Sequence, residues 1–149
     1  MSRASSSKVP GKRASEPCPC GHPLNHVDCC GRYHAGVAHL QAPDPESLMR
    51  SRYAAYVKDV CAYLLDTWHT DNSPDGIDPP ERGLKWLGLT ILKTTLTGPD
   101  TGKVLFVARY KVGGRAHRLA EASRFVREQG RWFYLDPCPG GEAPGVPSA

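Results

Sequence analysis

Four cysteines close to the N-terminus are the residues with the most distinctive chemistry in this chain. Cys18, Cys20, Cys29 and Cys30 follow the pattern C-x-C, then eight residues, then C-C. Thiols this close together serve either as disulfide partners or as ligands for one metal ion. Four thiolates complete the tetrahedron that Zn(II) prefers and leave no position open for a substrate. A zinc ion bound here would therefore have a structural role.

The residues that precede the cysteines favour the metal over the disulfide. Residues 1–16 are polar and basic, without the apolar stretch of a secretory signal. We therefore expect a cytoplasmic, reducing environment, in which clustered cysteines stay reduced. The sequence predicts one Zn(II) per chain, and a disulfide or unliganded thiols are the alternative. We expect His22 and His26 to be neighbours of the ion rather than ligands, and Gly21 to let the backbone turn beneath it.

The spacing of the four cysteines resembles the SEC-C motif, a small zinc module named for its place at the C-terminus of the translocase motor SecA. This chain matches the motif at every ligand position. The resemblance implies one bound zinc ion and a role as an interaction module for proteins or ribosomes. It does not imply a catalytic metal.

Composition and charge set limits on the rest of the chain. The chain has 149 residues, of which 40% are hydrophobic, and its net charge is +4. This length suits one globular domain with a small appendage. Most of the net charge lies in residues 1–17, so the remainder is nearly neutral and does not favour specific binding of nucleic acid. The basic tail can contact RNA or anionic surfaces weakly, and no apolar run is long enough to cross a membrane.

The pattern of the remaining sequence predicts two helices followed by four antiparallel strands. The first helix begins at Asp44, which can cap it, and the second begins near Asp59 and includes Trp68 on its apolar side. We expect Cys61, in the second helix, to be a packed core thiol rather than a nucleophile. Gly and Pro turns separate the strands predicted at 85–96, 104–110, 116–127 and 131–135. A turn or short helix is expected at Pro79–Glu81.

Beyond the cysteines, six segments in order resemble the YchJ family of bacterial proteins: Leu48–Tyr56, Tyr63–His69, Trp86–Leu89, Val107–Tyr110, Glu121–Glu128 and Arg131–Asp136. The resemblance implies an α+β fold with helices packed on a curved antiparallel sheet, a nuclear-transport-factor-2-like (cystatin-like) cone. The expected organisation is a disordered tail at 1–16, a zinc knuckle at 17–34, the cone at 44–136 and a second disordered tail at 137–149.

The chain departs from this family at two positions. Many members carry a second SEC-C knuckle at the C-terminus, whereas here Cys138 has no partner cysteine after it, and we expect it to be a free thiol. Members also often have a histidine where this chain has Ala120, which weakens a His–Glu pair with Glu121.

A cone of this shape can enclose a ligand pocket, and three residues are candidates for its chemistry. We expect Glu121, His69 and Arg109 at the mouth of a pocket walled by aromatic residues: Trp68, Trp86, Tyr53 and Trp132. A carboxylate within such walls can act as a general base. The alternative, which we favour, is that Glu121 forms an ion pair with Arg109 or Arg50 and that His69 caps a helix.

The sequence therefore supports two functional hypotheses. The first is a non-enzymatic zinc-knuckle protein that binds a protein or ribosomal partner, with Leu24, Val27 and Tyr33 as apolar contacts and Arg32 and His26 at the rim. The alternative for these residues is that they pack against the cone. The second hypothesis is a small-molecule-binding protein or an enzyme of the isomerase, dehydratase or hydrolase type that uses the cone pocket.

Overall fold

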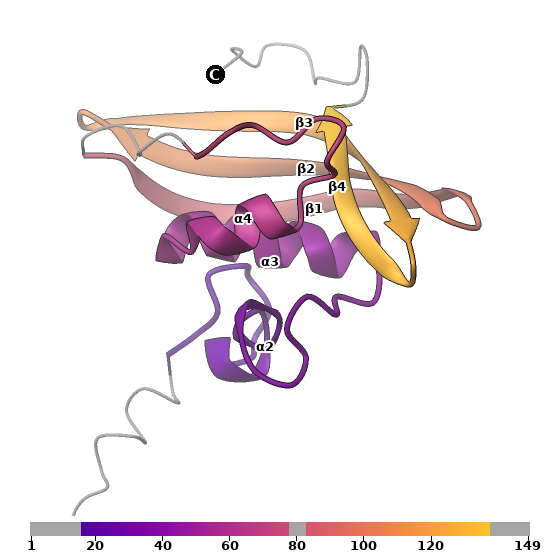
Figure 1. Ribbon diagram of the computed structural model, residues 1–149. Coiled ribbons are helices and arrows are strands. Elements are labelled where there is room, and N and C mark those ends of the chain that lie inside the picture. The colour runs from indigo at the N-terminus through magenta and orange to yellow at the C-terminus, as the bar shows by residue number, and fades with distance from the viewer. Residues whose placement is uncertain (1–15, 78–82, 138–149) are drawn as a thin grey trace, which may run out of the picture.

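The molecule has three layers: a four-stranded sheet, a pair of helices against one face of it, and a small N-terminal module on the far side of the helices (Figure 1). The computed structural model describes residues 16–77 and 83–137. The elements are the 3-10 helix η1 (His26–Asp28), the helices α2 (Gly31–His34), α3 (Pro45–Lys58) and α4 (Cys61–Asp66), and the strands β1 (Lys85–Gly98), β2 (Thr101–Val112), β3 (Arg115–Glu128) and β4 (Arg131–Pro137).

The sheet is an antiparallel meander with the strand order β1-β2-β3-β4, as expected for the α+β cone. Its hairpins fall where Gly-containing turns were predicted. Gly113 and Gly114 both have positive φ, and so do Gln129 and Gly130. Two-residue hairpin turns need this conformation to match the twist of the strands they join. The register between β2 and β3 is continuous, whereas β1 contains three irregularities.

Helix α3 begins as the sequence predicts. The side chain of Asp44 accepts a hydrogen bond from the backbone N–H of Ser47 at 2.7 Å, and Pro45 occupies the first turn. The helix ends at Asp59, whose backbone is left-handed (φ 62°). The second, shorter helix that the sequence predicts is present, but α4 runs only from Cys61 to Asp66, so the expectation that it includes Trp68 is wrong. Trp68 lies beyond it, in an isolated bridge with Tyr134 of β4.

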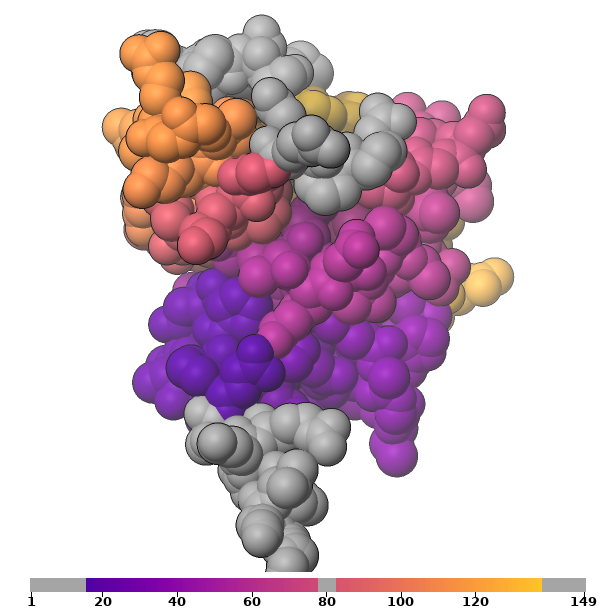
Figure 2. Space-filling model, turned by 90° about the vertical axis from the view of Figure 1, so that its left-hand side faces the viewer, coloured from indigo at the N-terminus to yellow at the C-terminus, as the bar shows by residue number. Residues whose placement is uncertain are grey.

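Helix α3 is buried on two sides because it lies between the sheet and the module. Leu48 and Tyr53 belong to the core that includes Phe106 and Phe125 of the sheet. Ala54, by contrast, is fully buried among the four cysteines. The space-filling view shows the module continuing into the surface of the helices (Figure 2). In the part of the chain that is described, no helix is long and apolar enough to cross a membrane.

Three expectations fall outside the described residues. They are the basic tail at 1–15, the turn or helix at Pro79–Glu81, and the C-terminal tail with Cys138.

The Asp44 cap provides a test of how α3 is anchored. Replacing Asp44 with Ala removes the side-chain acceptor for the Ser47 N–H, which typically costs about 1 kcal/mol of unfolding free energy. Asp44→Asn keeps an acceptor and should lose less. Urea denaturation of both variants measures the difference. Equal losses in the two variants would show that the cap does not hold this helix end.

Candidate metal centre

The four cysteines come together in space. The Sγ atoms of Cys18, Cys20, Cys29 and Cys30 all lie within 4.8 Å of one another, and all four residues are buried. They form one small cluster with Ala54 of α3. The C-x-C pair and the C-C pair therefore meet at a single point against the helix.

The sulfur positions suit a metal and not a disulfide. All four residues are free cysteines, and Cys20 Sγ lies 3.6 Å from Cys29 Sγ, whereas a disulfide bond is about 2.05 Å long. In a tetrahedral site with Zn–S bonds of about 2.3 Å, neighbouring sulfur atoms are about 3.8 Å apart. The cluster is therefore close to the size that four thiolates around one ion need.

Local backbone hydrogen bonds position the two cysteine pairs. Pro17 and Asn25 form an antiparallel bridge, and the Cys18 N–H donates to Leu24 O at 3.0 Å. This small loop turns at Gly21, which has a φ of 97° that a side chain would disfavour. The second pair directly precedes α2, whose first turns are closed by N–H bonds from Arg32 and Tyr33 to Cys29 O and Cys30 O. Gly21 thus has the role that the sequence predicts.

The four thiols influence one another's ionisation. The pKa of Cys20 is lowered, mainly by a hydrogen bond from Cys18. Burial raises the pKa of Cys29 to about 12, and hydrogen bonds with Cys18 and Cys20 raise the pKa of Cys30. Buried groups this close cannot all become negative, because each thiolate disfavours the next. A divalent cation at the centre would supply the missing positive charge.

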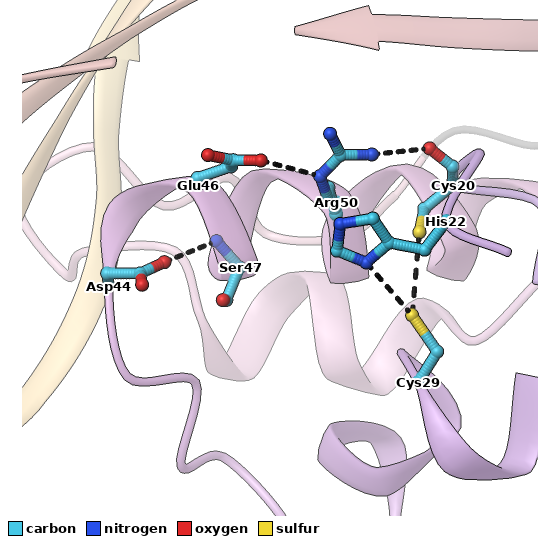
Figure 3. Close-up of polar contacts among 7 residues, drawn as sticks. All are labelled: Cys20, His22, Cys29, Asp44, Glu46, Ser47 and Arg50. Atoms are coloured by element: carbon cyan, nitrogen blue, oxygen red, sulfur yellow. Dashed lines mark hydrogen bonds and ion pairs between the residues drawn. The ribbon is translucent and has the colours of Figure 1, made fainter. Parts of the chain in front are cut away.

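Side chains of α3 fix the cluster to the rest of the molecule (Figure 3). Arg50 donates from Nη1 to Cys20 O at 2.8 Å and from Nε to Glu46 Oε2 at 2.9 Å. Lys58, at the other end of the helix, forms an ion pair with Glu16. His34 lies between these two contacts, with its Nε2 2.8 Å from Ser51 O. The module is therefore held to α3 along most of the length of the helix.

Two histidines lie beside the sulfur atoms. His26 Nδ1 lies 3.6 Å from Cys18 Sγ, and His22 Nδ1 lies 3.6 Å from Cys29 Sγ. Figure 3 shows the His22 ring with one nitrogen facing the Cys29 sulfur. Both residues are thus neighbours of the thiols, in the positions of hydrogen-bond partners.

A second site, a cavity of about 290 Å³, lies between α3 and the concave face of the sheet. Three of the four aromatic residues predicted to wall this cavity line it, namely Tyr53, Trp68 and Trp86. Tyr56, Phe106 and Tyr134 line it as well. The prediction that Trp132 walls this cavity is wrong. Trp132 is buried elsewhere, and its Nε1 donates to Pro43 O at 3.2 Å. Glu121 lines the cavity and accepts a hydrogen bond from Ser123 Oγ at 3.1 Å.

The other two candidate pocket residues do not reach this cavity. Arg109 lies on the opposite face of the sheet, and its Nη2 donates to Thr90 Oγ1 at 3.0 Å. His69 is buried against β3, where its Nε2 lies 2.8 Å from Glu128 Oε2 and its Nδ1 accepts from the Asp71 N–H. The expected grouping of Glu121 with His69 and Arg109 is therefore wrong, as is the helix-capping alternative for His69.

The cavity contains a cation that the sequence reasoning missed. Arg52 is only 4% exposed, and its Nη1 donates to Leu64 O and to Thr67 Oγ1, both at 2.8 Å. Its guanidinium lies 4.9 Å from the Trp68 ring centroid and 4.6 Å from that of Tyr134. Burial lowers the pKa of Arg52 and raises that of Tyr134. The sequence did contain a signal for this cation. Arg52 occurs at helical spacing with three other buried residues of α3, Leu48, Ser51 and Ala55, so the pattern places an arginine on the buried side of the helix.

Cys61 is not the core thiol that the sequence predicts. It is half-buried at the start of α4, and its Sγ donates to Asp59 Oδ1 at 3.5 Å. Its pKa is raised by desolvation and by the Asp59 carboxylate, so it is not activated as a nucleophile.

The comparisons with known proteins agree with both parts of the structure. Residues 44–137 match the family described as YchJ, middle NTF2-like domain. A UPF0225 protein of Methylibium petroleiphilum is 60% identical over 125 residues, which cover 84% of this chain and 90% of that protein. A UPF0225 protein of Xanthomonas oryzae is 51% identical over 130 residues, which cover 86% of this chain and 98% of that protein.

Two solved structures share the fold. The solution structure of a SEC-C motif containing protein from Rhodopseudomonas palustris has a TM-score of 0.69 at 30% identity, and covers 81% of this chain and 96% of its own. A crystal structure of a SEC-C motif containing protein from Psychrobacter arcticus has the same TM-score at 24% identity. The match covers 93% of this chain and 86% of that protein. Taken with the length and identity of the family matches, these findings show that the chain belongs to the YchJ (UPF0225) family.

Proposed function

We propose that Cys18, Cys20, Cys29 and Cys30 hold one Zn(II) ion and that the module they form is a non-enzymatic docking element for a protein or ribosomal partner. The four buried sulfur atoms support the metal, because an all-thiolate tetrahedral site favours zinc and leaves no open position for catalysis. The likeness to SEC-C motif proteins supports the same assignment.

The exposed apolar residues on the surface of the module are the main support for the docking role. Leu24 is 47% exposed, Val27 is 52% exposed and Val37 is fully exposed. Val27 and Val37 line an open groove of about 740 Å³, with His26, Arg32 and His34 among its polar residues. Exposed apolar side chains around a groove with a polar rim are typical of a surface that binds a partner. The contacts with α3 hold this surface in place. Tyr33 was expected to be part of this surface but is buried in the core.

A second function, binding of a small molecule in the cone, is favoured by the cavity beside α3. A volume of about 290 Å³ with aromatic walls, the carboxylate of Glu121 and the buried Arg52 has the character of a small-ligand site. The acid and the cation would orient a polar ligand, while the rings would cover its apolar surface.

The first prediction concerns the metal. The purified chain should contain about one zinc ion, and Cys20→Ser should lower this content sharply because it removes one of four thiolates. Cys61→Ser, outside the cluster, is the matched control and should leave the content unchanged. Elemental analysis measures the ion, and the thiolate-to-metal charge-transfer band of the cobalt-substituted protein reports its ligands. Equal zinc contents in all three proteins would contradict the assignment.

The second prediction concerns docking. Val27→Asp combined with Val37→Asp should weaken co-sedimentation with purified ribosomes, or with a partner identified by cross-linking, by at least about tenfold, since charges replace the apolar contacts. Leu92→Asp, at an exposed leucine of β1, is the control and should bind as wild type. Cys29→Ser combined with Cys30→Ser should also lose the partner. Identical partners for all of these variants would count against the module as the docking site.

The third prediction concerns the cavity. In a thermal-shift screen of small polar compounds, a ligand at about 100 times its Kd adds about 2.7 kcal/mol of stability, which raises the Tm by several degrees. Glu121→Gln should abolish that shift, because it removes the charge that lines the cavity. Glu128→Gln, which lies outside the cavity and faces His69, should retain it. A screen without any ligand-induced shift would leave the docking role as the sole proposal.

A further inference from the structure

The convex face of the sheet, which points away from the helices, is covered with cations. Side chains that alternate with the buried Val104, Phe106 and Ala108 on β2 must point to this face. The register places on it three residues of β2 and their neighbours on β1 and β3: Lys85, Lys93, Lys103, Arg109, Lys111, Arg118 and Arg124. We call this set the basic sheet face.

Six of these cations stand directly opposite another cation. The cross-strand pairs are Lys85 with Lys111, Arg109 with Arg118, and Lys103 with Arg124. Like charges directly opposite each other on a sheet are destabilising. Because Asp136 already compensates Arg124, the other two pairs, Lys85 with Lys111 and Arg109 with Arg118, are a cost to the folded chain by itself, and an anionic partner would remove that cost.

Acidic residues are nearly absent from the same surface. Strands β1 and β2 contain no Asp or Glu. Of the acidic residues on β3 and β4, Glu121 lines the cavity on the other face, Glu128 is bonded to His69, and Asp136 is paired with Arg124. Among the described residues, no carboxylate forms an ion pair with Lys85, Lys93, Lys111 or Arg118.

The neutral positions that β1, β2 and β3 contribute to this face contain no aromatic ring. They are Gly88, Thr90 and Thr95 on β1, Leu105 and Val107 on β2, and Ala116, Ala120 and Ala122 on β3. Sites that bind single-stranded nucleic acid use aromatic side chains to stack the bases. Cations that stand about 5 Å apart across strands, with Arg109 and Lys111 about 7 Å apart along β2, instead suit a regularly charged backbone.

We infer that the basic sheet face binds the phosphate backbone of double-stranded RNA without reading its sequence. Shape and phosphate contacts dominate recognition of duplex RNA, because side chains cannot read its deep major groove. This surface lies on the opposite side of the helices from the cysteine module, so the inference adds a second contact to the proposed docking role and does not depend on it (Figure 1).

The test is fluorescence anisotropy of a labelled RNA duplex, about 16 base pairs long and of arbitrary sequence, titrated with the full chain. Binding should weaken steeply with salt, with the slope of log K against log salt losing about one unit for each phosphate contact removed. The triple variant Lys93→Gln, Lys111→Gln, Arg118→Gln should bind at least about tenfold more weakly with a shallower slope. Its Tm should not fall, because two like-charge pairs are relieved.

Two matched variants distinguish this face from other basic regions. Lys58→Gln, Arg115→Gln, Arg127→Gln removes the same charge elsewhere and should bind as wild type. Replacing Arg3, Lys8, Lys12 and Arg13 of the N-terminal tail with Gln should leave most of the binding. The inference is overturned if the duplex does not bind, if the tail variant alone loses binding, or if both triple variants bind equally. It is also overturned if polyglutamate or phosphatidylglycerol vesicles bind as tightly as the RNA.

Discussion

The contact between the four sulfur atoms and helix α3 is the interaction on which the arrangement of this molecule depends. Apart from Ala54, the buried cluster of the module consists of the cysteines themselves, so the module has almost no apolar core of its own. A segment of this size needs a metal or a larger surface to fold against. Here the sulfur cluster packs against Ala54 of α3, whose small side chain lets the cysteines come close to the helix. Arg50 of the same helix donates a hydrogen bond to Cys20 O.

Because α3 serves two layers, its residues do not follow the pattern of a helix with one buried face. Ala54 faces the module, the Ser51 hydroxyl hydrogen-bonds to Tyr63 of α4, and Leu48 and Tyr53 belong to the core beneath the sheet; all four are buried. Arg52 is buried as well, and its charge is balanced by hydrogen bonds and by the faces of Trp68 and Tyr134. The helix thus contributes residues both to the candidate metal centre and to the candidate ligand cavity.

Local features of the fold were predictable, and features that depend on distant residues were not. The Asp44 cap and the glycine turns depend on neighbours in sequence, and the structure confirms them. The placement of His69 and Arg109 depends on which strand lies beside each, so their grouping with Glu121 was wrong. The burial of Cys61 was wrong for the same reason, because apolar sequence neighbours do not show which side of a short helix is covered.

The sequence by itself determined that four thiols would lie close together, since only eight residues separate the C-x-C pair from the C-C pair. Sequence similarity also determined the family. The succession of helices and strands follows from local periodicity. Only the tertiary structure decided how charge is distributed. A nearly neutral folded part contains a sheet face rich in Lys and Arg, because strand register sorts cations to one side, and net charge is a sum that carries no information on position.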